Sequence, residues 1–209
     1  MEKEISAIIV TKSSKRGAYC VAGHLIETGK WVRFVSSDEK SHGALTDGHL
    51  MYEDGGCVKI FDAVRVPVIS ALPLPTQPEN VLIDERRRWK KLGALKPESF
   101  LTYHPPEQNG ILFGNMLPYV SRKQISKIGR SLTMVLVKDL VIFRSNGTKM
   151  KASFCYQGWN YRDVAVTDPD FYSVPSGTMY RAANLVVSLP DVPFKNGRYY
   201  KFIAKIILL

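Results

Sequence analysis

The sequence predicts a mainly β protein built from two small five-stranded barrels. Ten short runs rich in Val, Ile, Tyr and Phe are separated by Gly, Pro, Asn or Asp, which is the pattern of strands joined by turns. Helical periodicity is scarce, and ten short strands in 209 residues are typical of a sandwich or a barrel. A proline-rich stretch divides the runs into two groups, each suited to one five-stranded Greek-key barrel.

The expected strands lie on both sides of that proline-rich stretch. The runs before it are 5–10, 19–27, 31–35 and 57–68, and those after it are 131–137, 141–144, 152–156, 164–167, 185–189 and 199–209. Asn146-Gly147-Thr148 lies between two of the later runs, and we expect a hairpin turn there, because nothing in the sequence indicates secretion and glycosylation. The last run ends wholly apolar, so we expect it to be a terminal strand of the second barrel.

Residues 73–130 are expected to form a crossover between an N-terminal barrel, 1–72, and a C-terminal barrel, 131–209. Its first part is extended by prolines, which fix φ and cannot donate ladder hydrogen bonds. A basic helix is expected over 81–92, with Asn80 as its N-cap and Gly93 as its stop. A second short helix is expected over 121–128, with Ser121 as its cap and Gly129 as its stop.

Composition limits the class of protein. No run approaches the ~18 consecutive apolar residues of a membrane span, and the N-terminus does not resemble a signal peptide, so we expect a cytoplasmic protein without membrane contact. The three cysteines, Cys20, Cys57 and Cys155, include no Cys-x-x-Cys pair, which argues against both a disulfide framework and a thiolate zinc site. The sequence indicates no cofactor.

The net charge of +10 is unevenly distributed along the chain. Residues 1–70 carry 9 Lys+Arg against 9 Asp+Glu, whereas 71–130 and 131–209 each carry 10 against 5. This asymmetry indicates a polyanionic partner for the middle and C-terminal parts. The alternative is that the basic balance only keeps the protein soluble.

Four motifs in this order together resemble the prokaryotic dual OB-containing domain family, over essentially the whole chain. They are CVAG at 20–23 with GKWVRFVS at 29–36, PTQPEN at 75–80 and VAVTDPDF at 164–171. The resemblance implies two OB-fold barrels, a fold often used to bind nucleic acid. It supplies no catalytic residue and no cofactor, so the site is argued from the residues themselves.

Trp31 and Arg33 lie two residues apart on one expected strand, and therefore share a face. If Val32 and Phe34 point into the core, Trp31 and Arg33 stand on the outer face, where an OB fold offers a stacking ring and a phosphate-directed cation. The alternative is that Trp31 is packed and Arg33 pairs with an acid such as Glu27.

The densest positive run is DERRRWKK, residues 84–91. Its cations are Arg86, Arg87, Arg88, Lys90 and Lys91, and they are candidates for phosphate contacts, which add salt-dependent affinity without sequence choice. The alternative is a solvated helix face in which some of them pair with nearby acids.

The C-terminal group holds two clusters in which rings and cations alternate. Trp159, Tyr161 and Arg162 surround Gly158, and a second cluster includes Tyr199, Tyr200 and Lys201. Stacking tolerates any base and contributes ~1–3 kcal/mol per base, so such clusters suit a platform for single strands. About half of these rings are expected to be core instead.

Evidence for catalysis is weaker. The four histidines include no closely spaced pair for a metal, and the sequence has no phosphate-binding loop, nucleophile elbow or zinc-protease motif. We therefore expect a non-catalytic protein that binds single-stranded or structured DNA or RNA. The alternatives are a protein-interaction module for an acidic partner and, less favoured, an enzyme acting on nucleic acid or nucleotides with Asp168 as its acid.

Overall fold

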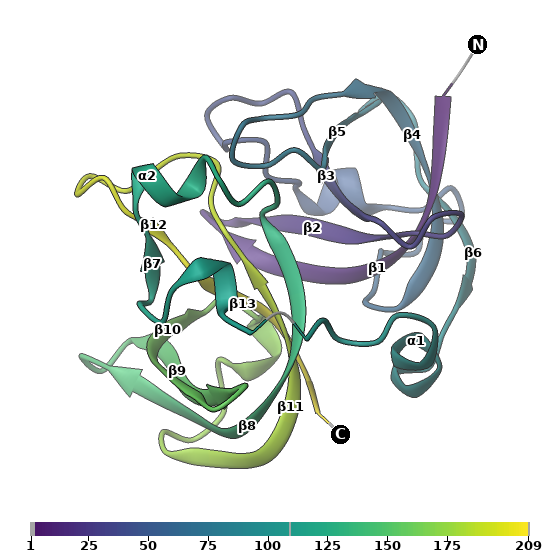
Figure 1. The fold of residues 1–209 in the computed structure, drawn as a ribbon. Coiled ribbons are helices and arrows are strands. Elements are labelled where there is room, and N and C mark those ends of the chain that lie inside the picture. The colour runs from purple at the N-terminus through teal and green to yellow at the C-terminus, as the bar shows by residue number, and fades with distance from the viewer. Residues whose placement is uncertain (1–2, 109, 209) are drawn as a thin grey trace. The chain divides into compact units, whose positions relative to one another are not determined.

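The computed structural model describes residues 3–108 and 110–208, which divide into two compact units (Figure 1). The first unit comprises Met1–Leu74 and Pro78–Pro105, and the second comprises Pro75–Gln77 and Pro106–Leu209. Each unit has its own hydrophobic core and consists mainly of strands. The expected mainly β fold with short helices is confirmed.

The first unit contains a six-stranded sheet, and five of its strands close into a ring. Its elements are β1 (Lys3–Lys15), β2 (Ala18–Leu25), β3 (Trp31–Val35), the 3-10 helix η1 (Asp47–Leu50), β4 (Asp62–Ala71), β5 (Asn80–Ile83), β6 (Lys90–Ala94) and α1 (Pro97–Tyr103). The order is β1-β2-β3-β5-β4, and β1 also pairs with β4, so these five strands form what we call the first barrel. A Cβ at Gly23 would lie 2.1 Å from Ile8 O, so this close approach of β2 to β1 requires glycine.

The second unit contains a closed five-stranded barrel, which we call the second barrel. Its elements are η2 (Leu112–Gly114), β7 (Tyr119–Val120), α2 (Arg122–Ile125), β8 (Leu132–Ser145), β9 (Lys149–Tyr156), β10 (Trp159–Val166), η3 (Pro169–Phe171), β11 (Thr178–Ser188), β12 (Tyr199–Tyr200) and β13 (Phe202–Leu208). The barrel order is β8-β9-β10-β13-β11.

Both barrels have the same connectivity. Numbered within each barrel, the strands pair in the order 1-2-3-5-4 and back to 1. In both, the third and fifth strands pair in parallel, β3 with β5 and β10 with β13, whereas the other neighbours in the ring are antiparallel. This is the Greek-key pattern of a partly open five-stranded barrel.

The prediction of a helix over 81–92 is wrong. This segment is β5, a turn and β6. Asp84 forms the turn by accepting hydrogen bonds from the Arg86 backbone N at 3.2 Å and the Arg86 guanidinium at 2.9 Å. Trp89 then enters the core of the first unit, where it is 1 % exposed and lies 5.1 Å from the Phe34 ring. Local hydrogen bonding and core packing therefore outweigh the helical spacing.

Two further differences concern the boundaries of elements. The runs 131–137 and 141–144 are one strand, β8, because Asp139 takes a positive φ of 51° at a bulge opposite β9 and pairing continues beyond it. Helix α1 was not expected, although Pro97 at its first turn and Glu98 after it are typical of a helix start. A helix begins after Ser121 as expected, but it spans only Arg122–Ile125 instead of 121–128. The hairpin turn at Asn146-Gly147, with φ of 50° and 76°, is confirmed.

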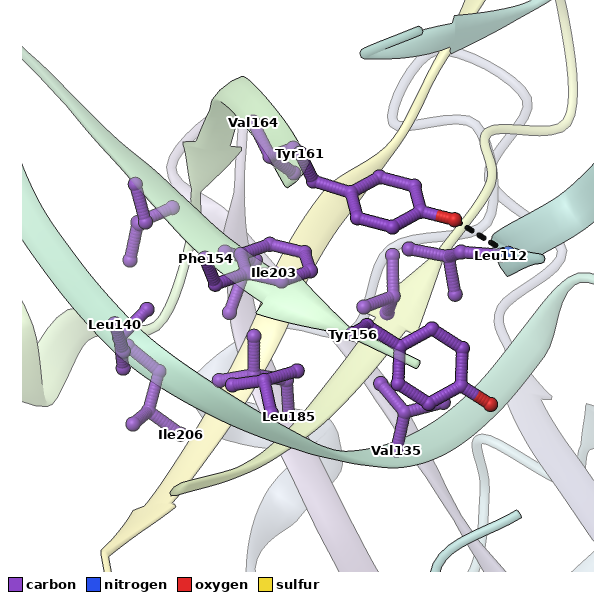
Figure 2. Close-up of a cluster of buried hydrophobic side chains, with 14 of the residues drawn as sticks. Leu112, Val135, Leu140, Phe154, Tyr156, Tyr161, Val164, Leu185, Ile203 and Ile206 are labelled. Carbon is purple, nitrogen blue, oxygen red and sulfur yellow. Dashed lines mark hydrogen bonds between the residues drawn. The ribbon is translucent and has the colours of Figure 1, made fainter. Parts of the chain in front are cut away.

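Figure 2 shows the core of the second barrel, which contains two tyrosines. Tyr161 is 0 % exposed and its hydroxyl accepts a hydrogen bond from the Leu112 backbone N at 2.8 Å. Tyr156 is 1 % exposed, and its hydroxyl donates to Glu107 O at 3.1 Å. The two rings fill the barrel while their hydroxyls fasten segments that precede β8.

Candidate nucleic-acid interface

The basic run 84–91 lies in the first unit, and most of its cations are engaged within that unit. Arg86 pairs with Asp84 through two hydrogen bonds of 2.9 Å, Arg87 lies 2.7 Å from Glu4, Lys91 lies 2.6 Å from the buried Asp62, and Arg88 donates to Gly48 O at 2.9 Å. Lys90 is exposed.

These pairs change how the run would act on a phosphate. The hydrogen bond from Arg86 is the main cause that lowers the pKa of Asp84 to about 2, so this carboxylate stays charged beside the guanidinium. Asp62 also accepts a 2.6 Å hydrogen bond from the Tyr52 hydroxyl, which places Lys91 in a network that includes a buried acid. These carboxylates offset part of the positive charge of the run, which lowers its attraction for phosphate.

Arg33 is not exposed to solvent, although it alternates with the core residues Val32 and Phe34. It is 4 % exposed and lies 3.9 Å from Glu79, whose side chain is also buried. Trp31 is half-buried and its ring centroid lies 4.1 Å from that of His24. The prediction of an exposed ring and cation is therefore wrong for Arg33. The alternative of a packed Trp31 with a paired Arg33 describes the structure, with Glu79 in place of Glu27 as the acid.

His24 and His104 form a pair that the sequence did not reveal, because 80 positions separate them. Their Nδ1 atoms lie 3.1 Å apart, and the Phe100 ring stacks on His104. Burial is the main cause that lowers the pKa of His24 to about 4, followed by the proximity of His104. Within residues 3–108 and 110–208, no group of three or more His, Cys, Asp or Glu side chains is arranged to hold a metal ion.

The predicted residues of the second unit separate into exposed and buried groups. Trp159 is 43 % exposed at the start of β10, and Arg162 is exposed on the same strand. Tyr161 belongs to the core and cannot stack on a ligand, so its prediction as a site residue is wrong. In the second cluster, Tyr199 and Lys201 are buried whereas Tyr200 is partly exposed.

A row of outward-facing residues crosses four strands of the second barrel. Phe143 on β8 is opposite Lys151 on β9, Lys151 is opposite Ala165 on β10, and Ala165 is opposite Phe202 on β13. All four are partly exposed, whereas their neighbours along the strands, such as Ile142 and Ala152, are buried in the core. Because residues directly opposite each other lie about 5 Å apart, the row is a continuous surface. Lys151 also lies 3.5 Å from Asp163, whose side chain is exposed.

The loop between β11 and β13 extends this row with more rings and cations. The Phe194 ring, 49 % exposed, lies 6.1 Å from Phe202 and 5.1 Å from Tyr200. The Arg198 guanidinium lies 4.1 Å above the Tyr119 ring, which is 5.8 Å from Tyr200. The hydrogen bond that Asn196 Nδ2 donates to the Tyr200 hydroxyl is the main cause that lowers its pKa, and Lys151 and Arg198 contribute to the shift.

We call this surface the ring-and-cation face, defined by Phe143, Lys151, Phe194, Arg198, Tyr200 and Phe202. The sequence signal that could have indicated it is PFKNGRYYKF at 193–202, in which rings and cations alternate around an Asn-Gly turn. The contributions of Phe143 and Lys151 could not be found from the sequence alone, because they depend on the strand register.

Three side chains, from Lys201, Thr76 and Gln77, hold the loop of the ring-and-cation face in place. Lys201 is 0 % exposed and its Nζ donates to Leu112 O at 2.8 Å and to Asn115 O at 2.7 Å. Burial lowers the pKa of Lys201 to about 7. At the other end of the loop, Thr76 Oγ1 donates to Asp191 O at 2.7 Å and Gln77 Nε2 donates to Leu189 O at 3.0 Å. The loop is therefore fastened at both ends by side chains from distant parts of the sequence.

The net charge of the protein lies mostly in the second unit. Residues 75–77 and 106–209 carry 14 Lys+Arg and 6 Asp+Glu, whereas residues 1–74 and 78–105 carry 15 and 13. The second unit therefore has the charge excess that attracts a polyanion, and the ring-and-cation face belongs to that unit.

Asp168, the candidate acid, is structural. It is 1 % exposed, accepts a hydrogen bond from the Ile206 backbone N at 2.9 Å and lies 3.2 Å from Lys205 Nζ. Burial raises the pKa of Asp168, and Lys205 opposes that shift. With its oxygens occupied inside the second barrel, this carboxyl cannot reach a substrate.

Comparison with models of known families matches residues 5–206 to the dual OB-containing domain. The comparison with curated proteins gives no match. No helix among residues 3–108 and 110–208 has both the length and the apolar character needed to cross a membrane.

Proposed function

Because the chain belongs to the dual OB-containing domain family, we propose that its second barrel binds single-stranded or structured DNA or RNA through the ring-and-cation face, without catalysing a reaction. OB folds commonly bind nucleic acid on the surface formed by their second and third strands and by the loops beside those strands. In the second barrel these strands are β9 and β10, which carry Lys151 and Ala165 of the outward row.

The observation that carries the proposal is that rings and cations meet on one surface of the strongly basic unit. Phe194, Tyr200 and Phe202 lie within 6.1 Å of a neighbouring ring and can stack on bases of any identity. Lys151 and Arg198 flank them and can contact the phosphates that connect those bases. Such a surface provides affinity for nucleic acid without strong sequence preference.

Trp159 and Arg162 are a proposed extension of this site along β10. Trp159 is exposed at the end of the strand, and Arg162 stands between it and Ala165 in the sequence. A single strand that follows the outer face of β10 would meet Ala165 and then Arg162, roughly 10 Å along at the ~3.3 Å rise of a strand residue. It would reach Trp159, which is opposite the buried Tyr156, only at the end of the strand.

The experiment measures binding of the full chain to fluorescent 20-nucleotide DNA and RNA of mixed sequence between 50 and 300 mM salt. With Lys151 and Arg198 as the phosphate contacts, the slope of log affinity against log salt should be about −1.4, since each contact on a single strand contributes about −0.7. Polyglutamate serves as the control polyanion. If the oligonucleotides do not bind at 50 mM salt, or bind no better than polyglutamate, the proposal is wrong.

Stacking is measured separately with Phe194→Ala. This change should weaken oligonucleotide binding by roughly 5- to 150-fold, corresponding to ~1–3 kcal/mol per stacked base, with little change of the salt slope. A reduced slope with unchanged affinity at low salt would contradict stacking at this position.

A further inference from the structure

The hydroxyl of Tyr200, on the ring-and-cation face, is the point on which several hydrogen-bond donors converge. Asn196 Nδ2 donates to it at 2.9 Å. The Arg198 guanidinium lies 4.1 Å above the ring of Tyr119, which is opposite Tyr200 on the neighbouring strand β7. The hydrogen bond from Asn196 is the main cause that lowers the pKa of Tyr200, followed by a hydrogen bond and the charge of Arg198 and by the charge of Lys151.

This single oxygen cannot engage all the donors around it. An amide, a guanidinium and an ammonium group together offer more N–H groups than one hydroxyl oxygen can accept. Because the oxygen of Tyr200 accepts from Asn196, the hydrogen of the hydroxyl can itself be donated to a ligand. Donors that converge on one point and carry positive charge suit an anion with several oxygen atoms.

Folding of the loop does not account for this convergence. Backbone hydrogen bonds already close the turn, from Phe194 N to Arg198 O at 2.9 Å and from Gly197 N to Phe194 O at 2.8 Å. Lys151 comes from β9 and is not part of the turn. Its ion pair with Asp163 spans 3.5 Å, and the Asp163 side chain is 57 % exposed, so the pair is weak and a stronger anion can replace it.

A phosphate at the end of a strand fits these donors better than one inside a strand. An internal phosphate carries a single charge, whereas a terminal phosphate monoester carries about −1.5 to −2 at pH 7 and has a third oxygen that accepts hydrogen bonds. The Phe194 ring lies 5.1 Å from the ring of Tyr200 and is 49 % exposed. The base next to a phosphate held at Tyr200 can therefore stack on Phe194.

We propose that the donors around the Tyr200 hydroxyl form a subsite for the phosphate at the end of a nucleic-acid strand. Asn196 and Arg198 donate to the phosphate oxygens, and Lys151 offsets part of the charge. The subsite rests on the proposed nucleic-acid binding and narrows its ligand to strands with a phosphorylated end. A 5′ phosphate and a 3′ phosphate share this chemistry, and separate strands distinguish them in the experiment.

The rings favour a nucleic acid over a phosphorylated peptide. A phosphorylated side chain could reach the same donors, but a peptide brings no row of flat bases to the exposed faces of Phe194 and Phe202. A phosphoserine peptide therefore serves as a control ligand.

The experiment is a competition for the full chain between a 20-nucleotide strand with an internal fluorophore and unlabelled eight-nucleotide strands of one sequence, in DNA and in RNA. These strands carry a 5′ phosphate, a 3′ phosphate or hydroxyls at both ends. One phosphorylated strand should compete about tenfold better than the hydroxyl-ended strand, because charge-assisted hydrogen bonds are the strong ones. A hydroxyl-ended strand of nine nucleotides adds one internal phosphate and should gain less than about threefold.

Tyr200→Phe provides the protein-side test, because it keeps the ring and removes the oxygen on which the donors converge. It should lower the preference for the phosphorylated end from about tenfold to about twofold. Lys195→Ala removes an exposed cation from the same loop and should leave that preference at about tenfold.

The results separate this inference from the proposed function. Binding of the 20-nucleotide strand with equal competition by all the eight-nucleotide strands would overturn the subsite alone, and so would an unchanged preference in Tyr200→Phe. Absence of binding by any oligonucleotide would overturn both the subsite and the proposed function. Stronger competition by the phosphoserine peptide than by the phosphorylated strands would assign the donors to a protein partner.

Discussion

The two barrels share one strand connectivity but differ in how they use their charged residues. The first unit carries 15 basic and 13 acidic residues, whereas the second carries 14 and 6. In the first, the densest basic run of the sequence is paired with Asp84, Glu4 and Asp62. In the second, dispersed cations such as Lys151 and Arg198 come together with rings on one face.

This difference shows that the density of cations along a sequence is a poor guide to the charge of a surface. A run of basic residues attracts acids from elsewhere in the fold, and the ion pairs then reduce its field. Cations far apart in sequence can instead meet in the fold, as Lys151 and Arg198 do around Tyr200. We therefore propose that the ligand binds at the second barrel and not at the basic run.

The largest effect that we expect concerns the two contrasting tryptophans. Trp89→Ala should lower the free energy of unfolding of the first barrel by about 3–5 kcal/mol, because Trp89 is 1 % exposed and its loss leaves a cavity. Trp159→Ala should cost the second barrel clearly less, about 1–2 kcal/mol, because that ring is 43 % exposed and only part of its surface is buried. Chemical denaturation followed by circular dichroism measures both, and equal losses would contradict this contrast.

A smaller effect is a pH dependence of stability, which we expect to differ between the two barrels. Burial lowers the folded-state pKa of His24 from its ordinary value of 6.5 to about 4, so the unfolded chain binds more protons as the pH falls through this window. The stability that neutral His24 contributes is present above pH 6.5 and is lost as the pH falls toward 4. Between pH 7 and pH 5 the first barrel should lose about 2 kcal/mol.

The matched variant for that measurement is His24→Phe, which keeps a ring among Trp31, Phe100 and His104 but has no titrating group. Its stability should depend less on pH between 7 and 5 than that of the wild type, by the same amount of about 2 kcal/mol. The second unit contains no histidine. Identical pH profiles for the wild type and His24→Phe would show that His24 titrates normally.

Much of the fold could be predicted from the sequence, because period-2 patterning and turn residues are local. The strand over 31–35 has the predicted bounds. The hairpin turn forms at Asn146-Gly147, as predicted, because these two residue types tolerate the positive φ that the turn requires. The prediction of a helix over 81–92 was wrong because two contacts favour other structures. The hydrogen bond between Asp84 and Arg86 favours a turn, and the packing of Trp89 against Phe34 favours a residue in the core. The spacing of apolar residues alone does not distinguish the apolar face of a helix from a turn that leads into the core.

The candidate site was harder to predict than the fold. Sequence clustering suggested Trp159 and Arg162, which are exposed, but also Arg33 and Tyr161, which are buried. Burial of a single polar or aromatic residue depends on packing partners distant in sequence, such as Glu79 for Arg33. Likewise, the row from Phe143 to Phe202 exists only once four strands are in register.

The central claim is that phosphate contacts come from the second barrel and not from the basic run. It is tested most directly by removing two cations from each barrel and measuring the salt dependence of binding to one 20-nucleotide single strand. Lys151→Ala with Arg198→Ala should reduce the slope of log affinity against log salt by about 1.4, whereas Arg86→Ala with Lys90→Ala should leave it nearly unchanged. A slope that falls with the Arg86 and Lys90 pair but not with the Lys151 and Arg198 pair would contradict the account and return the site to the first barrel.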